Sequence, residues 1–549
     1  MSQINSICIL GGGTSGFSMS ALLSQYRELS GLDFDIKLVY SEDIDTIGVG
    51  ESTLLGINEL FEYLGLKDDE WMKECNATYK VGIKFENFYK EGRYFNYPFG
   101  GRDRNREDAI RDWVMAMDAY PEICTPERAS QYFSGKSNLL MEFNKLTDLT
   151  GTGIAEDEYD LSENSAYHFD SKLLGKYLRK YAEEKGVEII NDTFKKAELN
   201  DDDSIKSIVC NDGTYEADLF IDCSGFKSLL LGGVMSDDEE EDYISYGDTL
   251  INDRVLRVNV PFESGVGNVA SEIDANANFK EEHLKNYTNC VALKNGWVWE
   301  IPLWDRLSVG YVHSNKFATE QEIREEFAEY CKKYWMDVEE GDFQPVIEFK
   351  TGRYKKGWVK NVIGVGLSYG FIEPLESTGI ATTLINSMRV LECLSKRDMH
   401  CRKVDADYYN ESVADNLDGL RTFIEMHYFL SSRDDSEYWR YVVDEVDYYD
   451  NDKVGSSGGM TYSQFFEKIY LQRNYVTSAA DLGLTLVACG MNYSCYSKAL
   501  LLNSDYEKGR LLMGVNQFRD MYENEYPPED LKLLPSTYEY TLENIYANT

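Results

Sequence analysis

The fold of this chain is decided by the stretch Ser6-Ile7-Cys8-Ile9-Leu10-Gly11-Gly12-Gly13-Thr14-Ser15-Gly16. Its apolar first half predicts a buried strand, and the apolar spacing after the last glycine predicts a helix. G-x-G-x-x-G between a strand and a helix indicates a dinucleotide site, although the motif alone is weak. The three glycines permit a tight turn, a close approach of the pyrophosphate and close packing of helix on strand, and the helix N-terminus offers free N–H groups to phosphates. The predicted cofactor contacts here are Gly11, Gly13, Thr14, Ser15 and Gly16.

Two further predicted strands lead to the same nucleotide. The strand 35–40 ends in Tyr40-Ser41-Glu42, where an acidic residue at the strand tip usually binds the ribose hydroxyls. In this chain the acidic residue, Glu42, comes two positions after the usual place. We therefore expect either Ser41 or Glu42 to make the ribose contact. A later strand ends in Asp222-Cys223-Ser224-Gly225 and can return the chain to the dinucleotide at the carboxyl edge of the sheet.

Composition excludes several kinds of partner. The 549 residues carry 55 Lys and Arg against 96 Asp and Glu, a formal net charge of −41 that repels nucleic acid and anionic membranes. There is no apolar run of about 18 residues and no basic leader, so we expect no membrane span and a cytoplasmic protein, in the host cytoplasm if it is viral. The 11 cysteines show no zinc spacing, and we predict no metal. A homo-oligomer is compatible with the sequence.

Two other stretches contain unusual side chains. Trp297 and Trp299 lie one residue apart before Ile301-Pro302, and a period of two places both indoles on one face of a strand. A buried core strand is the ordinary interpretation of such a pair. Lys80, in a strand-like stretch, is by the same statistics expected to be a solvated charge. Only enclosure of Lys80 would change that interpretation.

Polar residues of two Gly-containing segments suggest a ring-binding strap and an anion site. Gly48-Val49-Gly50-Glu51 suits a backbone strap against a planar ring, although a plain loop is equally consistent with it. Ser377-Thr378-Gly379 precedes a predicted helix and would present backbone N–H groups to a halide or carboxylate. Glu376, just before it, is a candidate acid for proton transfer or a helix-cap carboxylate.

Together the Gly fingerprint, Trp297-x-Trp299-x-Ile301-Pro302 and the stretch 374–379 resemble the flavin-dependent halogenases of the tryptophan-halogenase-like family. The similarity runs from the N-terminus to about residue 545. It implies that reduced FAD, supplied by a separate flavin reductase, reacts with dioxygen and halide to give hypohalous acid. This acid reaches a lysine beside a small aromatic substrate, and Lys80 matches that lysine.

The resemblance also assigns roles to the other residues. Glu376 matches the glutamate that polarises the oxidant or accepts the ring proton, and Thr378 and Gly379 match the halide site. Trp297 and Trp299 match the indoles that keep substrate from the flavin. The remaining residues assigned to FAD are Ser41, Gly50, Glu51, Asp222, Gly366 and Ile380.

The chain departs from the family at the substrate. Phe99 keeps one aromatic wall, but Tyr97 replaces a neighbouring histidine. Where a Tyr-Tyr pair and a glutamate would hold an amino acid, the chain has residues 456–459, Ser-Ser-Gly-Gly, and then Phe465, which we also assign to the substrate pocket. We therefore expect varied electron-rich aromatics of indole or phenol type rather than free tryptophan. In this the chain resembles marine bacterial and cyanophage members, some of which favour bromide or iodide.

These observations predict an α/β fold: a monooxygenase-like box with Rossmann-type FAD binding and a mostly helical C-terminal pyramid that binds substrate. We expect residues 1–400 to hold FAD and halide, with substrate-pocket segments inserted at about 75–165, and residues 401–549 to complete the substrate region. An FAD-dependent aromatic monooxygenase is the alternative function, and a flavoprotein with a degenerate site is a third. The tryptophan pair and Lys80 argue against the monooxygenase, and the presence of Lys80, Glu376 and Thr378 argues against a degenerate site.

Overall fold

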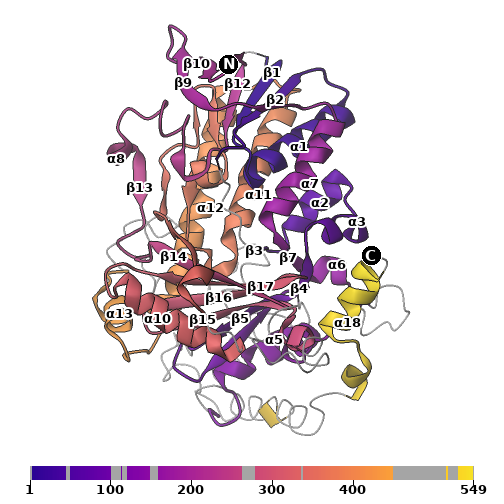
Figure 1. Ribbon diagram of the computed structural model, residues 1–549, viewed down its shortest axis with the longest axis vertical. Coiled ribbons are helices and arrows are strands. Elements are labelled where there is room, and N and C mark those ends of the chain that lie inside the picture. The colour runs from indigo at the N-terminus through magenta and orange to yellow at the C-terminus, as the bar shows by residue number, and fades with distance from the viewer. Residues whose placement is uncertain are drawn as a thin grey trace. The chain divides into compact units, whose positions relative to one another are not determined.

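The computed structural model describes residues 3–44, 50–100, 113, 116, 120–148, 159–262, 279–334, 338–448, 513, 515–516 and 529–547 (Figure 1). The chain forms two compact units, each assembled from three separate stretches. Unit 1 comprises Met1–Ala77, Tyr167–Leu250 and Phe349–Arg421, and unit 2 comprises Thr78–Ala166, Ile251–Glu348 and Thr422–Thr549. The sequence-based division at residue 400 separates an FAD and halide region from a substrate region. It concerns where ligands bind, and it stays a prediction.

A six-stranded sheet organises unit 1. Its order is β20 (Trp358–Val359), β21 (Val362–Gly364), β12 (Leu219–Asp222), β1 (Ser6–Leu10), β2 (Asp35–Tyr40) and β8 (Glu188–Asn191). β1 pairs in parallel with β2 on one side and with β12 on the other, so that Leu10 lies opposite both Val39 and Asp222. The carboxyl ends of these three strands therefore share one edge, where the strand order reverses and nucleotides bind in such sheets.

Helices and small sheets complete unit 1. α1 (Thr14–Ser30) lies against α7 (Ser171–Glu184) and α11 (Thr378–Ser395) (Figure 1). The short strand β3 (Gly50–Ser52) pairs with β7 (Ala166–Asp170). Two antiparallel sheets are added: β9 (Phe194–Leu199), β10 (Ile205–Cys210) and β11 (Thr214–Glu216), and β13 (Tyr243–Ser245), β19 (Gly352–Tyr354) and β22 (Gly370–Phe371).

Unit 2 is built on a seven-stranded sheet. Its order is β18 (Gln344–Glu348), β14 (Arg254–Pro261), β17 (Arg306–His313), β16 (Gly296–Pro302), β15 (Tyr287–Ala292), β5 (Gly82–Glu86) and β6 (Tyr94–Pro98). Among its described neighbouring pairs, β15 and β5 are parallel and the others are antiparallel. α10 (Glu320–Cys331) covers one face through Ile323, Phe327 and Cys331, which join a core containing Val298 and Tyr311.

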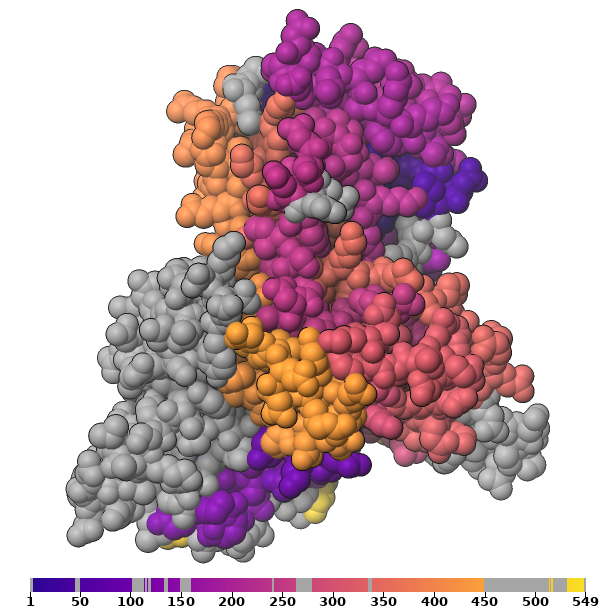
Figure 2. All heavy atoms as spheres, turned by 90° about the vertical axis from the view of Figure 1, so that its left-hand side faces the viewer, coloured from indigo at the N-terminus to yellow at the C-terminus, as the bar shows by residue number. Residues whose placement is uncertain are grey.

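Further helices of unit 2 come from the C-terminal third of the chain. α12 spans Lys403–Phe429 and reaches unit 2 at Thr422, and α13 spans Glu437–Arg440. Figure 2 shows the segment around α13 (orange) against the segment that contains β17 and α10 (salmon). The contact is aromatic, since the ring of Phe317 lies 5.6 Å from that of Tyr438 and 5.2 Å from that of Tyr441. None of the described helices is long and apolar enough to cross a membrane.

Candidate functional site

The glycine fingerprint of unit 1 forms a cradle that fits a dinucleotide. Gly11 has a φ of 124°, and a methyl group there would lie 2.2 Å from the carbonyl oxygen of Cys223. A methyl group at Gly16 would lie 1.9 Å from the carbonyl oxygen of Gly11, so both positions require glycine. By contrast, Gly13 has no atom within 4 Å of its added methyl group, which leaves room for a ligand. The first turn of α1 contains no acidic residue, so its N–H groups can receive a pyrophosphate.

The other residues predicted to bind FAD in unit 1 converge on the start of α1. The hydroxyl oxygens of Ser15 and of Thr383 on α11 lie 3.5 Å apart. A methyl group at Gly366 would lie 2.6 Å from the Ser15 hydroxyl and 2.8 Å from the Thr383 hydroxyl. Ile380 lies one turn before Thr383 on α11, and the Thr14 hydroxyl donates to the carbonyl of Ser171 at 3.3 Å. Their roles toward the cofactor stay predictions.

Asp222 is engaged with the chain's own amides. Its two oxygens accept hydrogen bonds from the backbone of Ser224 at 2.9 Å, Leu230 at 2.7 Å and Leu231 at 2.8 Å. Complete burial raises the pKa of Asp222, and these hydrogen bonds oppose the rise. The carboxylate thus shapes the loop that follows β12, and any contribution of Asp222 to FAD binding would come through that loop.

Both alternatives for the ribose contact lie at the tip of β2. The Ser41 hydroxyl accepts from Thr193 at 2.9 Å, which leaves its own hydrogen for a ligand. Glu42 accepts from the Tyr40 hydroxyl at 2.7 Å and from Arg179 at 3.4 Å. The hydrogen bond from Tyr40 is the main reason that the pKa of Glu42 is lowered. Arg179, on α7, was missed from the sequence because nothing in the pattern links it to Tyr40.

The predicted halide segment of unit 1 is a tight turn that leads into α11. The 3-10 helix η6 (Pro374–Glu376) ends at Ser377, whose φ of 59° is left-handed, and Thr378 starts α11. Glu376 and Thr378 are buried, whereas among the described residues no atom beyond the chain neighbours and the helix backbone of Gly379 lies within 4 Å of a methyl group placed there. The backbone at Gly379 is therefore open to a small anion.

The predicted flavin strap reaches this turn. The hydroxyl oxygens of Ser52 and Ser377 lie 3.0 Å apart, which joins β3 to the start of α11. In β3, Gly50 pairs with Asp170 and Glu51 with Phe169. Gly48 and Val49 of the strap lie outside the described residues. Unit 1 thus brings the predicted strap and the predicted halide segment together.

Lys80 lies in unit 2 at the end of β4 (Thr78–Lys80), and it is 0% exposed. The expectation of a solvated charge is wrong for this residue. Its Nζ lies 5.0 Å from the centroid of the Phe99 ring, on the face where a cation is attracted. The Thr78 hydroxyl donates to the carbonyl of Pro302 at 2.6 Å. Lys80, Phe99 and the end of the tryptophan strand are therefore linked in one assembly.

The tryptophan pair occupies β16 as the sequence predicts. The ring centroids of Trp297 and Trp299 lie 6.1 Å apart with the planes at 58°, and both rings are buried. Across the sheet Trp299 lies opposite Gly310, where a methyl group would be 2.1 Å from the indole. Gly310 therefore makes room for Trp299. It is a second residue that sequence analysis missed, because the pairing register was unknown.

The predicted substrate residues are only partly described. Tyr97, on β6, and Phe99 place their rings 6.1 Å apart and at 89°, and Tyr97 is half-buried. Phe99 also donates its N–H to the carbonyl of Val81, next to Lys80. Phe465 and the Ser-Ser-Gly-Gly stretch at 456–459 lie outside the described residues.

Comparison with known proteins identifies the family. The model of the family described as tryptophan halogenase matches residues 6–484. The chain is 30% identical to tryptophan 7-halogenase RebH of Lentzea aerocolonigenes over 518 residues, 88% of this chain and 90% of the relative. It is also 30% identical to tryptophan 6-halogenase SttH of Streptomyces toxytricini over 446 residues, 79% of this chain and 80% of the relative. The solved structure of VirX1 in its apo form matches with a TM-score of 0.83 at 31% identity, covering 99% of this chain and 100% of that one.

These matches and the cradle define a flavin-dependent halogenase, an enzyme that uses FAD and halide on an aromatic substrate. The chain belongs to the tryptophan halogenase family. The predicted fold class and family are confirmed, and the match favours a halogenase over the monooxygenase alternative.

Proposed function

We propose that this halogenase delivers hypohalous acid through Lys80 to an electron-rich aromatic of indole or phenol type. The observation that carries the proposal is a fully buried lysine beside an aromatic ring. A buried lysine must find partners for its charge or give up its proton. Either form is useful here, because an ammonium donates hydrogen bonds and an amine is a nucleophile.

Two routes of halogen transfer are consistent with Lys80. As an ammonium it would hydrogen-bond hypohalous acid and hold the electrophilic halogen beside the substrate. As an amine it would exchange one N–H for an N–halogen bond with release of water. In both routes a C–halogen bond then forms as the aromatic ring loses its proton. Holding the halogen at Nζ replaces a diffusive encounter with a positioned one, which is the main rate advantage available to such a site.

We assign the residues of unit 1 to the supply of hypohalous acid. When bound and reduced, FAD would supply electrons that reduce dioxygen to the peroxide level, and that oxidising equivalent would convert halide to hypohalous acid. The cradle at Gly11, Gly13 and Gly16 would hold its pyrophosphate, and the open backbone at Gly379 would bind the halide. By resemblance Glu376 polarises the oxidant or accepts the ring proton. A separate flavin reductase is the proposed transient partner.

The substrate proposal rests on residues that differ from the family. Tyr97 stands where a histidine is expected, and the Ser-Ser-Gly-Gly stretch at 456–459 replaces side chains that would hold an amino acid. We therefore propose that free tryptophan is not the preferred substrate. Bromide and iodide are the halides proposed on the same resemblance. The relatives RebH and SttH are tryptophan halogenases by name, so this proposal separates the chain from them.

The test is halogenation by the full chain with FAD, a flavin reductase, and bromide or iodide. The panel contains phenols, indoles and free tryptophan, and products are identified by mass spectrometry. Lys80→Ala is expected to lose roughly a hundredfold in product formation. Lys84→Ala is the matched control, because Lys84 is partly exposed and pairs with Glu86 at 2.9 Å. Parent-like halogenation by Lys80→Ala refutes the role of Lys80, and hydroxylated products would point to a monooxygenase.

A further inference from the structure

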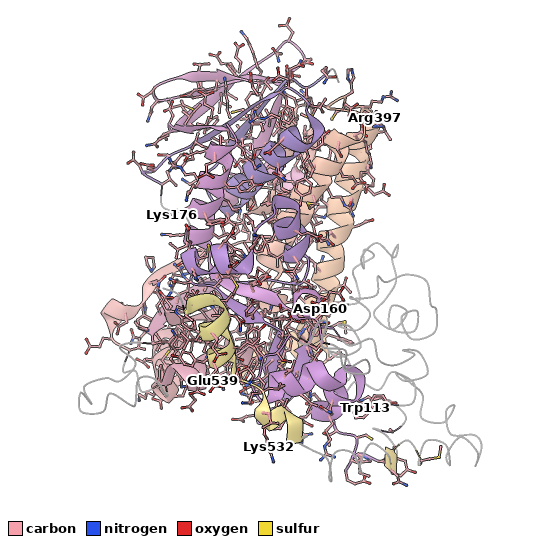
Figure 3. All side chains as sticks on the ribbon, turned by 90° about the vertical axis from the view of Figure 1, so that its right-hand side faces the viewer. Trp113, Asp160, Lys176, Arg397, Lys532 and Glu539 are labelled. Carbon is pink, nitrogen blue, oxygen red and sulfur yellow. The ribbon has the colours of Figure 1, made fainter. Side chains whose placement is uncertain are left out.

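The last described stretch of the chain folds back onto unit 2 beside the strand that carries Lys80. Residues 529–547, here called the C-terminal clasp, include η9 (Glu529–Leu533) and α18 (Thr537–Thr541). Figure 3 shows Glu539 on α18 and Lys532 on η9. α18 contacts β4, although more than 450 residues separate the two in sequence. The C-terminal clasp is linked by two routes to the residues on either side of Lys80: directly to Tyr79 on β4, and through hydrogen bonds to Val81.

The first route is a contact between two tyrosine rings. The ring of Tyr540, on α18, meets the ring of Tyr79 edge-on, with centroids 6.0 Å apart and planes at 71°. Tyr79 directly precedes Lys80 and is buried. Because Tyr79 is buried and its large ring has few rotamers, we expect a change at Tyr540 to be transmitted to the backbone of β4.

The second route is a chain of hydrogen bonds. The Thr537 hydroxyl donates to the Asn144 side-chain oxygen at 2.8 Å, and the same oxygen accepts the backbone N–H of Asn286 at 3.1 Å. The Asn286 carbonyl then accepts the N–H of Val81 at 2.6 Å. Val81 directly follows Lys80. Asn286 is itself fixed, since its amide group donates to the carbonyls of Leu140 and Lys145.

The C-terminal clasp is also anchored at the end of the tryptophan strand. The ring of Trp304, two residues after Pro302, lies parallel to that of Tyr546, with centroids 3.9 Å apart and planes at 4°. Tyr538 stacks near the same indole at 5.8 Å, and Lys280 Nζ lies 3.4 Å from its centroid. Such stacked and cationic contacts hold α18 in a defined place.

We propose that Thr537 and Tyr540 are positioning residues that set the place of Lys80 through Val81 and Tyr79. The inference rests on the proposed role of Lys80 in halogen delivery. Because Lys80 is fully buried, its stem has little room to compensate for a backbone shift, so the location of its head group depends on where the backbone at its Cα is held. A displacement of about 1 Å at a reacting group can cost up to roughly a hundredfold in rate. The C-terminal clasp acts on the delivery of hypohalous acid and leaves its formation alone.

The test separates delivery from formation. The full chain is assayed with FAD, a flavin reductase, bromide and a phenol, and a 1,3-dione traps hypohalous acid that escapes. Thr537→Val removes the hydroxyl at constant shape, and Tyr540→Leu removes the ring. Each is expected to lower the ratio of halogenated phenol to trapped acid about tenfold, while the sum of the two changes less than about twofold. Thr537→Ser and Tyr540→Phe keep the hydroxyl and the ring, and are expected to restore the ratio.

Thr541→Val is the matched control. Thr541 lies on α18, is buried like Thr537, and its hydroxyl has no hydrogen-bond partner in the described part of the chain. It should leave the ratio unchanged. The inference is overturned if Thr537→Val keeps the parent ratio, if product and trapped acid fall together, or if Thr541→Val has the same effect. Should Tyr540→Leu not fold, Thr537→Val alone decides.

Lys80→Ala in the same assay separates the two ideas. If Lys80→Ala halogenates like the parent, the proposed function of Lys80 fails, and the positioning inference fails with it. If Lys80→Ala loses the product while Thr537→Val behaves like the parent, only the inference about the C-terminal clasp fails.

Discussion

A single methyl group at Gly310 should displace Trp299. Gly310 lies on β17 directly opposite Trp299, and the added carbon of Gly310→Ala would be 2.1 Å from Cζ2 and 2.3 Å from Cε2 of the indole. These separations are well below contact distance. The indole cannot move freely, because it is buried and its neighbour Trp297 lies 6.1 Å away on the same face. We expect Gly310→Ala to push the ring out of its rotamer or to move the two strands apart.

The expected loss follows from overpacking of a buried site, which costs about 1–3 kcal/mol in free energy of unfolding. Urea denaturation followed by far-UV circular dichroism measures that loss, and near-UV circular dichroism reports the changed surroundings of the two indoles. If the Trp299 ring is the cause, Gly310→Ala in a Trp299→Leu background should cost less than about 0.5 kcal/mol, since the obstructing ring is gone.

The control is Gly419→Ala in α12, where no atom lies within 4 Å of the added methyl group. It should be neutral or stabilise by about 0.5–1 kcal/mol, as Gly to Ala does within a helix. A Gly310→Ala protein with the unfolding midpoint of the parent would refute the steric account. So would a penalty of the same size in the Trp299→Leu background.

Two further predictions concern pH and cofactor binding. Burial lowers the pKa of His313 from 6.5 to about 4, and a hydrogen bond with the Ser314 backbone opposes only part of that shift. The unfolded chain therefore takes up a proton near pH 6.5 that the folded chain does not, and the free energy of unfolding should fall by about 3 kcal/mol between pH 6.5 and 4. In His313→Leu, the urea midpoint should depend less steeply on pH across this range. An unchanged pH dependence in His313→Leu would contradict the assignment. Gly16→Ala should weaken both the fold and FAD binding because its methyl group would collide with the Gly11 carbonyl, whereas Gly13→Ala should weaken FAD binding alone. Flavin fluorescence titration beside thermal unfolding distinguishes them, and equal FAD affinity in Gly13→Ala and the parent would count against the cradle.

Local pattern was enough for the parts of the site that the chain builds from neighbouring residues. The strand, glycine turn and helix at 6–30 follow from apolar spacing and glycine placement, and the structure has them as β1 and α1. The alternation in β16 follows from the period of a strand, with Val298 in the core that α10 covers and the two tryptophans at alternate positions. These features need no information about distant segments.

The remaining features depend on contacts between distant segments, which a single sequence does not reveal. The burial of Lys80 involves a strand whose Thr78 bonds a carbonyl 224 positions away. Asp222 was predicted as a cofactor contact, and the structure shows its carboxylate bound to amides 8 and 9 positions further on. Nothing in the local spacing indicated that the C-terminal clasp would reach β4.

The anchoring of β16 bears on how halide and substrate preference can vary in this enzyme. Before the strand, Glu326 accepts the backbone N–H of Lys294 at 2.8 Å and the side-chain amide of Asn295 at 2.9 Å. After the strand, the carbonyl of Pro302 accepts from Thr78. Both ends of the tryptophan strand are thus held by side chains, and one of these contacts joins it to the strand of Lys80. A substitution that moves the tryptophan pair should therefore also move Lys80, so neither can be repositioned alone.

Differences in substrate preference should consequently come from residues near Phe99, whose ring lies beside the Lys80 head group. Phe99 is joined to the Lys80 strand through the Val81 carbonyl, whereas Tyr97 is half-buried and meets Phe99 only edge-on. Replacing Tyr97 changes the wall of the proposed pocket and leaves the backbone hydrogen bond between Phe99 and Val81 in place. Because the proposed delivery depends on Lys80 and the proposed selection on the wall, a change at Tyr97 should redistribute products among aromatic substrates while the total of hypohalous acid formed stays the same.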